Sequence, residues 1–139
     1  MRRNRASLVL IEQVIMLLVF ALASALCIKA FAWADTESAA AAERDKALLR
    51  AQNAAQIIKN SGDIAAAELL GGCAEGERWI IYYDEEWQSV ESGGVYTLTA
   101  EPKEDGLHYM SAARVEVYKG AELLLSVDAA WQEVAKDEG

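Results

Sequence analysis

Hydrophobic and polar residues follow three different patterns along the chain. From Leu8 to Ile28 nearly every residue is apolar, and Glu12 is the single charged one. Residues 30–61 mix charged residues with apolar residues that recur every three or four positions, as on one face of a helix. That apolar stripe consists of Leu48, Ala51, Ala55 and Ile58. Beyond residue 72, apolar residues alternate with polar ones, which is typical of strands.

The first two patterns predict one long helix. Neither Gly nor Pro occurs before Gly62, and Asn60-Ser61-Gly62 is a typical stop signal. A helix that spans a bilayer needs about 20 mainly apolar residues, which the stretch from Leu8 to Ile28 provides. We therefore expect a transmembrane half at residues 8–29 and an amphipathic half at residues 30–61.

Residues 62–139 predict a globular head with a short helix and a three- to four-stranded antiparallel sheet. Asp63 suits the N-cap of a helix at residues 64–70, which Gly71-Gly72 would close. The expected strands lie at residues 79–83, 95–100, 109–119 and 123–127, with a charged turn at residues 102–106.

Such a sheet needs cover on one face and is solvated on the other. In the third expected strand Ala113, Val115 and Val117 share one face, and Arg114 and Glu116 share the opposite one. The helical stripe can cover the apolar face. The predicted fold class is therefore α+β, with a long transmembrane and amphipathic N-terminal helix packed on a small antiparallel sheet.

The charge of the chain is divided between its two ends. The whole chain has a net charge of −9, whereas residues 1–34 carry three Arg and one Lys against Glu12. That segment is therefore +3 and the remainder −12. A basic flank before an apolar run predicts a cytoplasmic N-terminus with the acidic head outside. An acidic head lacks the clustered Lys and Arg that phosphate contacts need, so we expect no direct nucleic-acid binding.

Glu12 is the most informative residue, because a carboxylate in hydrocarbon costs roughly 2.5–3.5 kcal/mol on insertion scales. A plain anchor gains nothing from that cost, so the placement indicates a partner for Glu12. The segment Ser7-Leu8-Val9-Leu10-Ile11-Glu12 resembles the processing motif of type IV pilins and pseudopilins. In that family a short basic leader ends in a small residue, usually Gly, and a glutamate is the fifth residue after the cut. Residues 1–7 would be the leader, with cleavage between Ser7 and Leu8.

The resemblance implies both a pathway and partners. A prepilin peptidase would cleave after Ser7, and the new N-terminus, Leu8, would be methylated. Glu12 would neutralise the amine of a neighbouring Leu8 in the filament. The partners would be other pilin or pseudopilin subunits, the peptidase, an inner-membrane assembly platform and membrane lipid. The chain would be a structural subunit of a type IV pilus, a type II secretion pseudopilus or a competence pseudopilus. Lys29 stands about where the family often has proline, which fits a minor subunit better than a major one.

Two other hypotheses remain open. A single-pass membrane scaffold with an extracytoplasmic domain would keep its leader, and Glu12 would matter little to it. A secreted binding domain would be released at Asp35, because Ala32-Trp33-Ala34 has the form of a signal-peptidase site.

Residues that could carry chemistry are few. The chain has no nucleophile-elbow, P-loop or zincin motif, so we expect no enzyme, no cofactor, no metal and no catalytic residue. Its one histidine, His108, is expected to be structural. Cys27 and Cys73 lie in different parts of the chain and predict no disulfide.

Two further clusters have a structural interpretation. The run at residues 84–86 and the pair Glu104-Asp105 could bind Ca²⁺ weakly, but a solvated turn is the preferred interpretation. The aromatic residues Trp79, Tyr82, Tyr83 and Trp87 are expected to pack in the core and sheet.

Overall fold

The structure is a computed structural model that describes residues 2–104 and 110–132. His108 and Asp105 lie outside the described residues, as do the side chains of Arg2 and Arg3. The chain divides into two compact units, residues 1–42 and residues 43–139.

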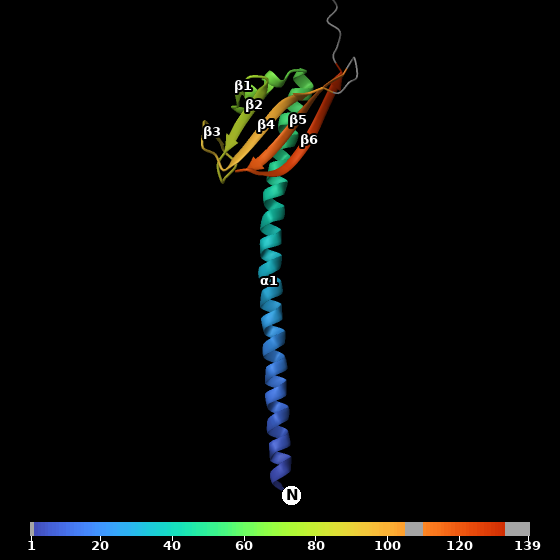
Figure 1. The fold of residues 1–139 in the computed structure, drawn as a ribbon, viewed down its shortest axis with the longest axis vertical. Helices are drawn as coiled ribbons and strands as arrows, with labels where there is room; N and C mark the ends of the chain where they lie inside the picture. Colours follow the sequence, from blue (N-terminus) through green and yellow to red (C-terminus); the bar gives the residue numbers. More distant parts are fainter. Residues whose placement is uncertain (1, 105–109, 133–139) are drawn as a thin grey trace, which may run out of the picture. The chain divides into compact units, whose positions relative to one another are not determined.

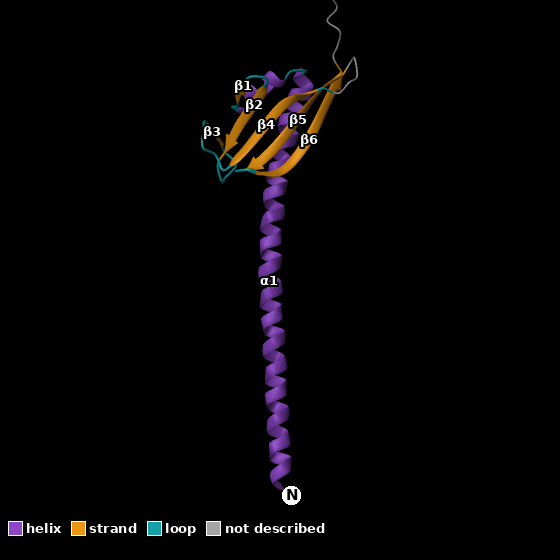
Figure 2. Ribbon diagram, viewed as in Figure 1, coloured by secondary structure: helices purple, strands orange, loops and turns teal. Residues whose placement is uncertain are grey.

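One long helix comes first, and a short 3₁₀ helix and six strands follow it in the described part of the chain (Figures 1 and 2). This is the predicted α+β fold, in which a long apolar N-terminal helix packs on a small antiparallel sheet through its distal part. The elements are α1 (Arg2–Ser61), η1 (Ile64–Leu70), β1 (Cys73–Glu75), β2 (Arg78–Tyr83), β3 (Ser89–Val90), β4 (Tyr96–Lys103), β5 (Met110–Lys119) and β6 (Glu122–Gln132).

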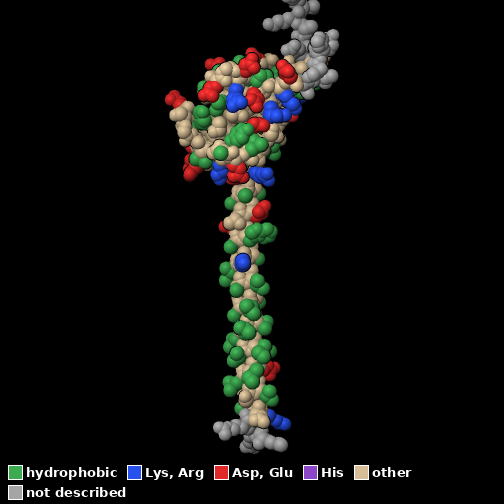
Figure 3. All heavy atoms as spheres, in the orientation of Figure 1, with side chains coloured by type: hydrophobic (Ala, Val, Ile, Leu, Met, Phe, Trp, Pro, Cys, Tyr) green, Lys and Arg blue, Asp and Glu red, His purple; other side chains and the backbone are tan. Residues whose placement is uncertain are grey.

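The first unit is the apolar part of α1. Its described side chains are exposed except for the half-buried Ser24, and hydrophobic side chains cover most of its surface (Figure 3). Two of its hydroxyl groups bond to the helix itself: Ser24 Oγ donates to the Phe20 carbonyl at 2.9 Å, and Thr36 Oγ1 donates to the Trp33 carbonyl at 2.8 Å. An 18-residue window of α1 has a mean hydropathy of 2.5, so this helix is long and apolar enough to cross a membrane.

In the second unit, one face of α1 packs on the sheet. The buried residues of this face are Ala47, Ala51, Ala54, Ala55 and Ile58. The prediction was right for Ala51, Ala55 and Ile58 and wrong for Leu48, whose side chain is 39% exposed. Residues 47, 51, 54 and 58 follow helical spacing, whereas position 48 is turned about 100° away from position 47. The core therefore takes small side chains from the helix and bulk from the sheet.

The sheet is antiparallel throughout, in the order β1-β2-β4-β5-β6, with β3 paired to β2 beside this path. Its inner face carries Ile81, Leu98, Val115 and Val117, which are fully buried with Ile58 of α1. This confirms the predicted apolar face of β5. Apolar burial of this kind contributes about 25 cal/mol for each Å² removed from water, so these five side chains stabilise the contact between helix and sheet.

The sheet has two strands that the sequence did not predict, β1 and β3. These strands are only three and two residues long, so they leave little alternating pattern in the sequence. The expected turn at residues 102–106 is also wrong in part, since β4 continues to Lys103. Pro102 pairs with Ala113 of β5 but lies beyond the end of β2. A residue without an N–H is tolerated at such an edge position. The fourth predicted strand is likewise longer and ends at Gln132.

The outer face of the sheet carries charges that alternate in sign from strand to strand. In register across β4, β5 and β6 stand Glu101, Arg114 and Asp128. Arg78 of β2 contacts Glu101 at 3.0 Å, and Asp128 accepts from Arg114 at 3.1 Å and from Lys103 at 2.6 Å. Hydrogen bonds from Lys103 and Arg114 hold the pKa of Asp128 below its ordinary value. These pairs satisfy the charges of a solvated face and add little stability.

The short helix η1 begins and ends where the sequence predicted. Asp63 is its N-cap and accepts a hydrogen bond from the Ala65 N–H at 3.0 Å. Gly71 ends it with φ 85°, a left-handed conformation that Gly adopts without steric cost.

We expect Ile58→Ala to lower the free energy of unfolding by about 2–5 kcal/mol, because it empties a fully buried site. Leu48→Ala removes a side chain of similar size from an exposed position and should cost about 0.5 kcal/mol or less. Both values can be measured by urea unfolding of the full chain in detergent, followed by tryptophan fluorescence. Equal losses for the two variants would contradict this assignment of the packed face.

Candidate assembly sites

The predicted processing and assembly residues lie on the first unit of α1. Ser7, Leu8 and Glu12 are all exposed there, and the helix already includes the leader residues from Arg2 onward. Leu8 and Glu12 are four residues apart and therefore lie on one helical face. No hydrogen bond or ion pair to Glu12 is formed by the described side chains. The carboxylate is displayed on an apolar surface, where it can neutralise a cation that a second molecule supplies.

A second candidate site is built on the loop after β2. The Asp84 carboxylate accepts hydrogen bonds from the N–H of Glu86 at 3.0 Å and of Gln88 at 2.8 Å. The Asp84 N–H donates to the Gln88 carbonyl, and its own carbonyl accepts from the Trp87 N–H. Asp side chains commonly order turns in this way. The loop is thus fixed by one carboxylate and returns the chain to β3.

Trp87 is the anchor of this loop. Its φ is 61°, in the left-handed region that non-glycine residues rarely adopt. Its ring is buried and stacks on Tyr96 with 4.0 Å between centroids. The Arg50 guanidinium donates to the Trp87 carbonyl at 2.7 Å and lies 5.3 Å from the centre of the Tyr83 ring. Stacking and the hydrogen bond from α1 together stabilise a backbone conformation that is costly by itself.

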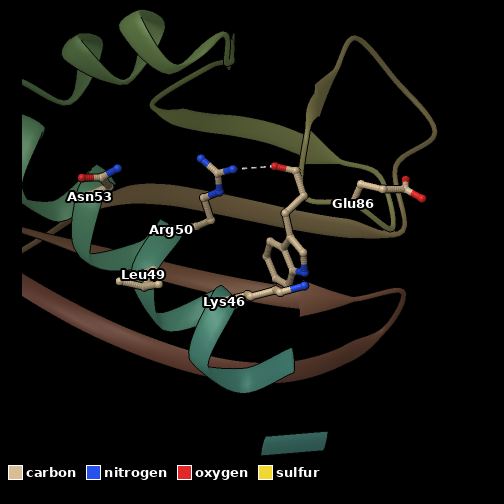
Figure 4. A pocket seen from close by; sticks show the side chains of 6 residues that line it. Lys46, Leu49, Arg50, Asn53 and Glu86 are labelled. Atoms are coloured by element: carbon tan, nitrogen blue, oxygen red, sulfur yellow. Dashed lines mark hydrogen bonds between the residues drawn. The ribbon is translucent and has the colours of Figure 1, made fainter. Parts of the chain in front are cut away.

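An open groove of about 400 Å³ lies between α1 and this loop. Figure 4 shows Arg50 reaching the Trp87 carbonyl, with the Glu86 carboxylate directed away from Arg50. Lys46, Leu49, Arg50 and Asn53 come from one face of α1, and Glu86 and Trp87 from the loop. The groove therefore combines two cations, an amide and an exposed leucine with one carboxylate, Glu86, which is directed away from Arg50. Such a lining suits an acidic protein segment better than a small apolar ligand.

A charge cluster lies beside the groove. Glu43 of α1 accepts hydrogen bonds from Lys119 Nζ at 2.5 Å and from the Tyr96 hydroxyl. These bonds, first from Lys119 and then from Tyr96, hold the pKa of Glu43 below its ordinary value. Burial and the bond to Glu43 raise the pKa of Tyr96 to about 12. The cluster joins the start of the packed segment of α1 to β4 and β5.

Sequence patterns indicated the aromatic residues of this site but not its cation. Tyr83 and Trp87 are buried and Trp79 and Tyr82 are half-buried, so the prediction of core and sheet packing is confirmed. Arg50 lies off the predicted stripe, yet it is half-buried and bonded to Trp87. A contact between residues 37 positions apart leaves no local signal. The only hint is that Arg50 directly precedes Ala51 of the stripe.

The acidic run at residues 84–86 acts as a turn in the structure. Asp84 bonds to the backbone of its own loop, and Glu85 and Glu86 are exposed. Within residues 2–104 and 110–132, no group of three or more His, Cys, Asp or Glu side chains could hold a metal ion. Cys27 and Cys73 are both free thiols.

The chain matches no protein-family model, no curated protein and no solved structure.

The Glu43 cluster predicts an acid-sensitive contribution to stability. Because the folded state lowers the pKa of Glu43, its contribution is complete above the unfolded value of 4.5 and is lost as the pH falls through the folded value. We expect Glu43→Gln to lower the free energy of unfolding by about 1 kcal/mol at pH 7. That difference should shrink as the pH falls below the unfolded value of 4.5 and through the lower folded value. Urea unfolding at several pH values measures it, and a difference independent of pH would contradict the assignment.

Proposed function

We propose that this chain is a structural, minor-type subunit of a pilin-like filament. The observation that carries the proposal is the position of Glu12. It is the single charge in the apolar stretch from Leu8 to Ile28, and it is the fifth residue after the Ser7–Leu8 bond. The α+β fold and the apolar helix support the same conclusion.

In the proposed filament Glu12 gains a partner that the membrane does not provide. In hydrocarbon an unpaired carboxylate costs several kcal/mol, so its presence there indicates that it is paired in the functional state. Cleavage after Ser7 would create an amine at Leu8, and Glu12 of the adjacent subunit would neutralise it. Desolvation offsets much of the Coulomb gain of such a pair, so its main effect is to specify the register of neighbouring helices. Ordered polymerisation requires that each helix adopt one fixed axial position relative to its neighbours.

The mechanism is polymerisation rather than catalysis. In the membrane the helix would be inserted with its N-terminus in the cytoplasm and its acidic head outside. An assembly platform and its ATPase would move the helix out of the lipid into the filament, where other subunits replace lipid around it. The filament could belong to a type IV pilus, a type II secretion system or a competence system. Lys29 within the helix fits a minor position, where fewer neighbours surround it.

The test of this pathway is the intact mass of the chain after co-expression with a prepilin peptidase. We expect a product that begins at Leu8 and carries one added methyl group. Because the family usually has Gly before the cut, Ser7→Gly should raise the processed fraction. An inactive peptidase is the control. If the parent chain and the Ser7→Gly variant both keep their leader in the presence of the active peptidase, a membrane scaffold is favoured. A chain that begins at Asp35 would favour a secreted domain.

The role of Glu12 gives a second prediction. Glu12→Ala would leave the Leu8 amine unpaired in a dry interior, at a cost of about 3–5 kcal/mol. Incorporation into filaments should therefore fall about 100-fold or more, while membrane insertion is retained. Sheared filaments and membrane fractions, compared by immunoblotting, measure the two quantities.

Glu37→Ala is the matched control, because Glu37 is an exposed glutamate on the same unit of α1 outside the apolar stretch. Normal filament incorporation of the Glu12 variant, at the level of this control, would contradict the proposed role.

A further inference from the structure

The described basic residues of the second unit fall into two groups. Those on the sheet all have a carboxylate partner within the described chain: Arg78, Lys103, Arg114 and Lys119. Those on α1 have none among the described residues: Arg44, Lys46, Arg50 and Lys59. Among the described residues of the head, the cations without a carboxylate partner therefore all lie on one helix. This distribution points to an acidic partner for the helix.

Two of these cations lie in the groove beside Trp87. Lys46 is exposed, and Arg50, whose guanidinium donates to the Trp87 carbonyl, lines the same groove. Positions 46, 49, 50 and 53 share one helical face, so their side chains can contact the same bound segment. Leu49, 65% exposed, adds an apolar contact between the cations. Asn53 can donate a hydrogen bond at the end of the row (Figure 4).

The chain itself carries a segment of matching chemistry. Glu75 pairs with Arg78 across a two-residue turn, so Gly76 and Glu77 form the tip of the β1–β2 hairpin. Both glutamates are exposed and have no partner among the described residues. Nothing lies within 4 Å of the position where a side chain of Gly76 would begin. The tip is therefore open, narrow and doubly acidic.

Other acidic segments fit the groove less well. The Asp84 carboxylate is bonded within its own loop, and Glu86 already forms the rim of the groove. Glu101 and Asp128 are paired with the cations of the sheet. The hairpin tip instead borders an open hollow of about 370 Å³, and both of its glutamates line that hollow. Glu75 and Glu77 offer two carboxylates to two cations one helical turn apart.

The tip and the groove lie at opposite ends of the same strand. β2 begins next to the Glu75–Glu77 turn and ends at Tyr83, from which the loop to Trp87 departs (Figure 1). The two surfaces of one chain therefore cannot meet each other, whereas a second copy displaced along β2 brings them together. Such a head-to-tail contact leaves a free groove and a free tip, so it continues through many copies.

We propose that the groove formed by Lys46, Leu49, Arg50, Asn53 and Trp87 binds the acidic Glu75–Glu77 hairpin tip of a second copy of this chain. This inference rests on the proposed function, because a head-to-tail contact is useful to a subunit that polymerises. It adds a named contact between heads to the proposed contact between N-terminal helices. Opposite charges at exposed positions provide specificity and direction of binding more than affinity.

Cysteine cross-linking in the full chain tests the contact. Cys27 and Cys73 are replaced by Ser, and Asn53→Cys and Glu75→Cys are introduced at exposed positions. The chain is co-expressed with a prepilin peptidase, and membranes and filaments are oxidised. We expect a ladder of disulfide-linked copies, and chains with a single cysteine should give at most a dimer.

Charge reversal in that background identifies the partners. Lys46→Glu or Glu77→Lys should each lower the cross-linked yield about tenfold, because each places like charges together. The two changes combined restore an attractive pair and should return the yield to about that of the parent. Lys59→Glu is the matched control, since Lys59 is an exposed cation of α1 outside the groove and should leave the yield unchanged.

The intact mass of the same sample keeps the two proposals apart. A mature chain beginning at Leu8 that stays monomeric on oxidation overturns the head contact and leaves the proposed function standing. A ladder formed by a chain that keeps its leader supports the contact and contradicts the pilin pathway. Cross-links to a different protein, or a double reversal that fails to recover the yield while the single variants fold, overturn the assignment of the second copy.

Discussion

The packing of one alanine-rich face of α1 on the inner face of the sheet is the constraint on which the second unit depends. A single antiparallel sheet cannot bury both faces, so its apolar face needs a cover. Ala47, Ala51 and Ala54 contribute small side chains to the interface. Leu98 and Val115 of the sheet contribute larger side chains to the same buried cluster. This pairing of small with large side chains is the way interiors reach crystal-like density. Turning α1 by a single residue position would set Leu48 against the sheet in place of Ala47.

The same helical orientation decides what the remaining faces of α1 can do. With Ala51 and Ala54 against the sheet, Arg50 stands at the edge of the interface and reaches the Trp87 carbonyl. That bond and the stack on Tyr96 hold Trp87 at a positive φ. The loop in turn forms one wall of the groove, so the shape of the groove depends on core packing as well as on the hydrogen bonds that Asp84 makes within the loop. Lys46, one turn before Arg50, and Leu49, directly before it, remain exposed.

Sequence reasoning succeeded where the physics is local and failed where it depends on distant partners. The cap at Asp63, the stop at Gly71 and the two faces of β5 follow from neighbouring residues alone, and the structure has them as predicted. The predicted helix face was wrong at Leu48, because hydrophobicity alone does not distinguish leucine from alanine at a packed position. The inner face of this sheet packs against the smaller side chain, Ala47. β1 and β3 carry too few residues for an alternating pattern to stand out. Arg50 could not be assigned to Trp87 from the sequence, since that contact exists only once helix and sheet have met.

The two proposed contacts differ in how strongly water and salt would weaken them. In the proposed filament Glu12 would lie in a dry interior, where an unpaired charge is costly and salt hardly screens it, so a mismatch of register would be strongly penalised. Lys46 and Glu77 are exposed to water, where a pair is worth little singly and is screened within about 10 Å at 0.1 M salt. A weak contact of this kind can select the approach of a second head without trapping wrong arrangements. The pairing proposed for Glu12 would then fix the register of the N-terminal helices.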